Sequence, residues 1–151
     1  MKLFSILFLA ASFALVACGD DSSSSSAPPN ENGSDSPSKP KYDCTVKGGV
    51  KVLYPAGGET FHLGDTITVV YGSDVQGSGY RFIFKVNEED LGKDAFPNSV
   101  GPEEPDGKTC YEQKIVLSKD LAKASNEAII RVAPYERQNK GADSEPFKVK
   151  E

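Results

Sequence analysis

Acidic and aromatic side chains gather in and around residues 87–110, and these are the groups in this chain best suited to binding chemistry. The stretch holds seven acids and two lysines, a formal charge of −5, whereas residues 42–151 as a whole carry −4. Carboxylates bind hard cations or accept hydrogen bonds from hydroxyl groups, and aromatic rings stack on apolar surfaces. At 24 residues the stretch exceeds the usual length of an unstructured connection. Such loops are often functional or disordered.

Three interpretations of this stretch stay open. In the first, it is a solvated connection whose Phe96 packs over the edge of the domain. In the second, it binds a sugar, and Phe96, Tyr111 or Tyr80 stacks on the sugar ring. The acids that would then accept hydrogen bonds from the sugar hydroxyls are Glu88, Glu89 and Asp90.

The third interpretation is a calcium site. Two groups of carboxylates could supply its ligands, namely Glu88, Glu89 and Asp90, or Glu103, Glu104 and Asp106. Calcium takes six to eight oxygen ligands, and the ligand spacing of an EF-hand loop is absent. We therefore expect no resident cofactor, with calcium as the one alternative.

The sequence predicts a binding protein and not an enzyme. The single histidine, His62, falls in an expected turn, where a solvated side chain is the ordinary outcome. Neither the Gly-x-Ser-x-Gly nucleophile turn nor a phosphate-binding glycine loop is present. A formal net charge of −5 has the wrong sign for contact with a phosphate backbone, so nucleic acid is not an expected partner.

The N-terminus is typical of an export signal. Lys2 precedes an apolar run of twelve residues, 3–14, which is shorter than the roughly 20 residues that a membrane-spanning helix needs. Residues 15–18, Leu-Val-Ala-Cys, resemble a bacterial lipobox. That resemblance implies removal of residues 1–17 and acylation of Cys18, which would anchor the protein to a membrane through its lipid. An ordinary secretory signal with a chance cysteine is the alternative.

The residues after Cys18 favour a tether in the outer membrane. Gly19 stands where an acidic residue would resemble an inner-membrane retention signal, and an acidic pair follows at 20–21. Residues 22–41 contain no large aliphatic or aromatic side chain, so we expect 18–41 to be a lipidated cysteine and a disordered Ser/Pro-rich stalk. The sequence is compatible with a domain at 42–151 that faces the periplasm and with one that faces the cell surface.

Residues 42–151 have the pattern of an all-β domain. Apolar residues alternate with polar ones in short runs, which is typical of half-buried strands. The expected strands are 49–54, 66–71, 80–86, 112–117, 128–133 and 146–150. Gly, Pro and Asp punctuate the gaps, and only 119–124, with Ser118 as an N-cap, favours a helical turn. About seven strands in this length predict an immunoglobulin-like or fibronectin type III-like β-sandwich.

The two ends of this domain carry more specific motifs. Residues 54–71 hold a proline, a Gly-Gly-Glu turn, an aromatic, a glycine and a strand; residues 129–132 and 144–149 read Ile-Ile-Arg-Val and Ser-Glu-Pro-Phe-Lys-Val. They resemble the Ser-Thr-rich membrane-anchored, KRE/KNH-type yeast cell-wall-synthesis domain and its bacterial relatives. Phe61 and Tyr71 stand where that family usually has tryptophan. The resemblance implies a sandwich fold and a surface role, and it implies no catalytic residues.

Two cysteines remain once Cys18 is assigned to lipid. Compartments beyond the inner membrane are oxidising, so the two remaining cysteines, Cys44 and Cys110, are predicted to form a disulfide. It would close a loop of about 67 residues, worth about 4 kcal/mol in the chain-entropy model. A metal site would need further ligands at suitable spacing, and none is present.

These observations predict a bacterial outer-membrane lipoprotein that presents one non-catalytic sandwich, residues 42–151, for binding at the cell envelope or surface. The expected partner is a polysaccharide or a host or substrate surface. The alternative is a structural role in which the domain docks other envelope proteins. Fold resemblance alone does not decide between them.

Overall fold

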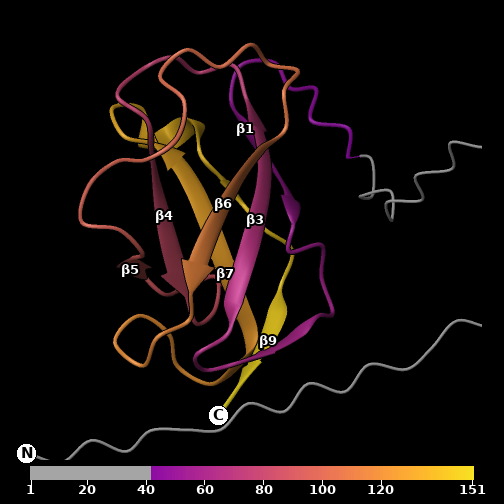
Figure 1. Cartoon of the computed structure of the whole chain (residues 1–151), viewed down its shortest axis with the longest axis vertical. Helices are drawn as coiled ribbons and strands as arrows, with labels where there is room; N and C mark the ends of the chain where they lie inside the picture. The colour runs from indigo at the N-terminus through magenta and orange to yellow at the C-terminus, as the bar shows by residue number, and fades with distance from the viewer. Residues whose placement is uncertain (1–41) are drawn as a thin grey trace, which may run out of the picture. The chain divides into compact units, whose positions relative to one another are not determined.

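The computed structural model describes residues 42–151, which form one β domain (Figure 1). The predicted signal peptide 1–17, the predicted lipidation site Cys18 and the predicted tether 18–41 lie outside the described residues. The domain contains a single short 3₁₀ helix, η1 (Gln138–Lys140), among the residues described. Its strands are β1 (Val50–Tyr54), β2 (Thr60–His62), β3 (Thr66–Ser73), β4 (Tyr80–Lys85), β5 (Lys93–Asp94), β6 (Tyr111–Val116), β7 (Ser125–Pro134), β8 (Ala142–Asp143) and β9 (Phe147–Lys150).

The strands form two sheets packed face to face, which confirms the predicted all-β sandwich. The first sheet has the order β1-β3-β6, and the second has the order β2-β9-β7-β4-β5 with β8 also paired to β7. In Figure 1, β3 and β6 cross in front of β7. The chain therefore leaves the first sheet after β1 and enters the second at β2, where it runs parallel to β9.

The core fills the space between the sheets with the side chains that the alternation predicted. Each long strand contributes every second residue to the core between the sheets. The alternate residues lie on the outer faces, where Val70, Ile83 and Ile129 are also buried. Tyr71 of β3 lies at the centre, with its ring 5.3 Å from Tyr80, 5.4 Å from Phe82 and 5.7 Å from Tyr111. The buried members of the core are Val50, Ile67, Val69, Tyr71, Tyr80, Phe82, Phe84, Ile115, Leu117, Ala122, Ala128, Ile130, Val132, Phe147 and Val149.

The Gly-Gly-Glu motif forms the turn that carries the chain between the sheets. Gly57 and Gly58 have φ values of +102° and +83°, which L side chains rarely adopt. The Glu59 carboxylate accepts hydrogen bonds from the backbone N–H groups of Ala56 and Gly57, both at 2.9 Å. Phe61 then packs edge-on against Phe147 and is partly buried against the core.

The expected helical turn after β6 is present as a single turn. Ser118 accepts a hydrogen bond at its carbonyl from Ala122 N–H, at 2.8 Å, and at its hydroxyl from Leu121 N–H, at 3.3 Å. The strand that follows is longer than predicted, because β7 begins at Ser125 and not at 128. Three strands of two or three residues, β2, β5 and β8, were not predicted.

The stretch 87–110 is not one unstructured connection. Its middle forms β5, which pairs with β4 through Ile83 and Asp94. Val100 then forms an isolated bridge to Tyr80, with backbone hydrogen bonds of 2.8 and 3.0 Å. Lys93, Asp94 and Val100 thus extend the second sheet. Among residues 42–151, no helix has both the length and the apolar character to cross a membrane.

Candidate functional site

An arginine–aspartate pair lies on the outer face of the second sheet, beside the short strand β5. The alternation of β4 buries Tyr80 and Phe82 and turns Arg81 outward between them. Asp94 of β5 receives two hydrogen bonds from Arg81, from Nε to Oδ1 at 2.9 Å and from Nη2 to Oδ2 at 2.6 Å. This contact raises the pKa of Arg81, so the guanidinium stays protonated. The side chains are 29% and 39% exposed, which leaves the pair open to a ligand.

The pair forms one wall of a hollow of about 360 Å³. This volume is near the lower end of the range for small-molecule sites, roughly 300–1,000 Å³. The lining combines a charged pair, aromatic rings and amides, and we call it the Arg81 hollow. Its lining residues are Arg81, Asp94, Phe96, Pro97, Asn98, Tyr135 and Gln138.

Two aromatic rings border the hollow. Phe96 packs perpendicular to Phe82 of the core, with 5.9 Å between ring centroids. This contact with the core fixes the orientation of the Phe96 ring. Tyr135 directly follows β7 and is 52% exposed, although its backbone N–H donates to Gly79 O at 3.0 Å. A rigid backbone therefore presents an exposed ring, which is the form in which aromatics stack on ligands.

A second arginine on the same face, Arg131, positions the part of the hollow that Gln138 lines. Arg131 of β7 donates from Nη1 to Asp143 Oδ1 at 2.9 Å and from Nη2 to the backbone oxygen of Gln138 at 3.3 Å. It therefore ties η1 to the sheet and holds Gln138 beside the hollow. Half-exposed ion pairs contribute little to stability, typically about 0–1 kcal/mol, so the organisation of this face is their larger effect.

The groups of the hollow are suited to binding a polar ligand. They are a paired guanidinium and carboxylate, two neutral amides and the hydroxyl group of Tyr135. None of them is a nucleophile next to a base, which is the arrangement that covalent catalysis uses. Planar polar groups beside aromatic rings instead match a ligand that has hydroxyl groups and apolar C–H faces.

Only one of the predicted stacking residues lies in the hollow. Phe96 does, and its packing on Phe82 also agrees with the interpretation in which it covers the edge of the sandwich. Tyr80 is 1% exposed, and its hydroxyl donates to Val75 O at 2.9 Å. The prediction that Tyr80 stacks on a sugar is therefore wrong, because its ring belongs to the core. Tyr111 is half-buried in the other sheet and does not reach the hollow.

The predicted hydroxyl-binding acids lie elsewhere. Glu88 and Glu89 line a separate depression with Glu127 and Ile129. Asp90 caps its own turn by accepting a hydrogen bond from Val86 N–H at 3.0 Å, and such backbone contacts lower its pKa. These acids therefore do not converge on Phe96, as the second interpretation requires. The carboxylate that does accompany Phe96 is Asp94.

The calcium candidates do not form a site. Within residues 42–151, no three His, Cys, Asp or Glu side chains group in a way that could hold a metal ion. Asp106 instead closes a turn, because its carboxylate accepts from Thr109 N–H at 2.7 Å, Lys108 N–H at 2.8 Å and Thr109 Oγ1 at 2.8 Å. These bonds, with Thr109 N–H first, lower the pKa of Asp106 to about 2. Glu103 and Glu104 do not complete this cluster.

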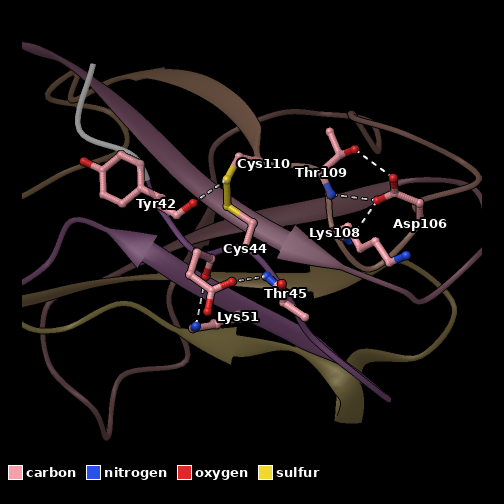
Figure 2. Close-up of a disulfide and its surroundings, with 9 residues drawn as sticks. Tyr42, Cys44, Thr45, Lys51, Asp106, Lys108, Thr109 and Cys110 are labelled. Atoms are coloured by element: carbon pink, nitrogen blue, oxygen red, sulfur yellow. Dashed lines mark hydrogen bonds between the residues drawn. A yellow bond between two sulfur atoms is a disulfide. The ribbon is translucent and has the colours of Figure 1, made fainter. Parts of the chain in front are cut away.

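The predicted disulfide is present and fixes the start of the domain. Figure 2 shows the bond between Cys44 and Cys110, with the ring of Tyr42 pointing away from it. The two Cα atoms are 5.2 Å apart, within the usual range for a disulfide. Cys44 is 2% exposed, and the next segment is held by a 3.0 Å bond from Val46 N–H to Gly107 O. The chain therefore enters the domain through a cross-linked segment.

Most residues of the Arg81 hollow were missed from the sequence. Phe96 was the one lining residue named from the sequence; the alternation of residues 80–86, which puts Arg81 on the face opposite Tyr80 and Phe82, is a further signal. Asp94 joins it through the pairing of a two-residue strand, and Tyr135 and Gln138 join it through the fold of β7 and η1. His62, by contrast, is exposed at the end of β2, as expected.

Comparison with known proteins returned no matching family model, curated protein or solved structure. The resemblance to the lipobox and to the cell-wall-synthesis domain stays a prediction from residues 15–18 and from the motifs at 54–71 and 129–149.

Proposed function

We propose that this protein is an outer-membrane lipoprotein, anchored through Cys18, whose sandwich binds polysaccharide non-catalytically at the cell envelope or surface. The observation that carries the binding role is the Arg81 hollow, where Phe96 and Tyr135 flank a hydrogen-bonded Arg81–Asp94 pair. The anchor rests on the sequence of residues 15–18. Together they give a tethered protein that holds a glycan close to the membrane.

The binding role is tested with the full chain solubilised in detergent. We would measure its retention on insoluble polysaccharides and on a glycan array, for the wild type and for Tyr135→Ala. Because Tyr135 is 52% exposed, its removal should leave folding intact and reduce retention at least tenfold. Phe96→Ala should also lose retention, but it disturbs the contact with Phe82, so its thermal stability must be measured in parallel.

A matched control is Leu91→Ala. Leu91 is 95% exposed and does not line the hollow, so its removal takes away exposed apolar surface without touching the proposed site. Retention should be unchanged. If Leu91→Ala and Tyr135→Ala reduce retention equally, binding is non-specific and the proposal fails.

A second candidate function is docking of another envelope protein. It is favoured by β6, which lies at the edge of its sheet and carries Val116 at 54% exposure. Edge strands can pair with a strand from a partner, although outward charges such as Lys114 oppose this. Cross-linking in the native membrane, from a photoreactive residue at 114, would capture such a partner.

A further inference from the structure

We infer that the Arg81 hollow takes a neutral glycan, and that the Arg81–Asp94 pair binds two adjacent hydroxyl groups of one sugar ring. This inference rests on the proposed function and specifies the ligand class of the same site. It follows from the way the two charges are paired, from the groups beside them and from the surrounding charge.

The pair offers donors and an acceptor side by side. Its two hydrogen bonds use two of the five N–H groups of the Arg81 guanidinium, and each carboxylate oxygen of Asp94 has more than one lone pair. A hydroxyl group both donates and accepts. Neighbouring hydroxyls of a sugar can therefore accept from Arg81 and donate to Asp94 while the pair stays intact.

An anionic ligand fits the same groups poorly. A carboxylate or phosphate approaching Arg81 would meet the charge of Asp94, whose oxygens lie 2.6 and 2.9 Å from the guanidinium nitrogens. Displacing Asp94 would leave that carboxylate without its partner. The domain as a whole carries a formal −4, and residues 87–110 carry −5, so the surroundings add further repulsion. A ligand without charge avoids both costs.

The other lining groups also suit a sugar. Asn98 and Gln138 each provide an amide that donates and accepts, and Gln138 is held in place through the bond from Arg131 to its backbone oxygen. Phe96 is held by Phe82, and Tyr135 presents an exposed ring at the border. The rings offer apolar surface for the C–H faces of the sugar, while the amides reach hydroxyls that the ion pair does not.

The test compares neutral and acidic polymers as ligands of the detergent-solubilised full chain. The neutral set is a (1→4)-linked β-glucan, a (1→4)-linked mannan and a (1→4)-linked xylan, whose internal residues keep adjacent free hydroxyls at C2 and C3. The acidic set is polygalacturonate and alginate. Each neutral polymer is also supplied after periodate cleavage and borohydride reduction, which destroy adjacent hydroxyl pairs. We expect retention on at least one neutral polymer, loss of that retention after periodate treatment, and none on the acidic set.

Two variants with the same change in charge separate the pair from the rest of the domain. Asp94→Asn removes the acceptor in the hollow and should lower affinity for the neutral polymer about tenfold. Asp65→Asn makes the same change beside the end of β2, where the aspartate contacts His62 and does not line the hollow. The Asp65 side chain is 49% exposed against 39% for Asp94, and its replacement should change affinity less than twofold. Thermal unfolding of both variants checks that they are folded.

The outcomes distinguish this inference from the function on which it rests. Retention on acidic polymers in preference to neutral ones, or full affinity in Asp94→Asn, would overturn the neutral-diol inference. If retention were still lost in Tyr135→Ala, the proposed polysaccharide function would stand. A folded wild-type protein that binds no polymer of either set would overturn both.

Discussion

The backbone carbonyl of Cys44 packs directly against Gly72, close to the C-terminal end of β3. A Cβ atom built at Gly72 would overlap this carbonyl, and it would also lie 3.1 Å from Cys44 Cβ. Gly72 is paired to Lys51 of β1, so the strand itself cannot easily move away. The glycine is thus required because the cross-linked entry segment crosses β3 at this point.

Gly72→Ala should therefore destabilise the domain. The added methyl group forces the entry segment or β3 to shift, and over-packing of this kind typically costs about 1–3 kcal/mol. Urea denaturation followed by circular dichroism measures the change in the free energy of unfolding. A variant as stable as the wild type would show that the segment around Cys44 does not rest on Gly72 in solution.

A double-mutant cycle identifies the source of this cost. In a chain that carries Cys44→Ser and Cys110→Ser, the entry segment is no longer fixed to Cys110 and can move off β3. Gly72→Ala should then cost less than it does in the cross-linked chain, by at least 0.5 kcal/mol, about the smallest coupling that such cycles resolve. Equal costs in both backgrounds would place the strain within β3 itself.

The disulfide should itself account for much of the stability. Cys44 and Cys110 are separated by 66 positions, and the chain-entropy model gives about 4 kcal/mol for a loop of this length. Replacing both with serine should lower the free energy of unfolding by up to about this amount. Intact mass confirms the starting state, since the unreduced protein must be lighter than the reduced one by two hydrogen atoms.

The contribution of the Gly-Gly-Glu turn to stability can be tested by replacing Glu59. Glu59 accepts hydrogen bonds from Ala56 and Gly57, both at 2.9 Å, and it is the only side chain that satisfies these two N–H groups among the contacts described. Glu59→Ala should cost about 1 kcal/mol, the usual net value of a hydrogen bond. Glu59→Gln keeps one acceptor and should recover part of the loss. Equal stability of all three proteins would exclude a structural role for the carboxylate.

The long strands could be predicted because their alternation is a local property of the sequence. The runs around Tyr71 and Phe82 show it, and each proved to be a strand with the expected buried face. The run around Ile130 proved to be a strand that is buried on both faces. The short strands β2, β5 and β8 have too few residues to show a period. They exist because a longer strand beside them supplies hydrogen-bond partners, which no local pattern reveals.

The candidate site was harder to predict for the same reason. Arg81 and Asp94 lie 13 positions apart and meet only because β5 pairs with β4 in one particular register. Tyr80 is a different kind of error. The alternation had already placed it on the same face as Phe82 and Phe84, so the sequence itself argued for burial and against a stacking role.

Low pH should reduce the free energy of unfolding of the domain through protonation of Asp106. Hydrogen bonds, with Thr109 N–H first, lower its pKa from 3.8 to about 2, so the folded state prefers the ionised carboxylate. The stability that this provides is present above about pH 4 and is lost as the pH falls toward 2. Denaturation midpoints measured between pH 5 and pH 2 should fall over this window, and Asp106→Asn should make the fall shallower.

The titration of Asp106 can also be followed directly. The chemical shift of its carboxyl carbon should titrate with a midpoint of about 2 in the wild type. Thr109→Val removes the 2.8 Å hydrogen bond from Thr109 Oγ1 but keeps the two backbone donors. The midpoint should therefore rise only part of the way toward 3.8. A wild-type midpoint near 3.8 would mean that the turn is open in solution.

The membrane anchor is tested at Cys18. If residues 15–18 are a lipobox, Cys18 carries the acyl chains, and Cys18→Ala should move the protein almost entirely from the membrane fraction to the soluble fraction and abolish labelling with palmitate. The variant with Cys44→Ser and Cys110→Ser keeps Cys18, so it should stay in the membrane and take up label. An ordinary secretory signal predicts a wild-type protein that is soluble and unlabelled. Retention of Cys18→Ala in the membrane would show that something other than this cysteine holds the protein there.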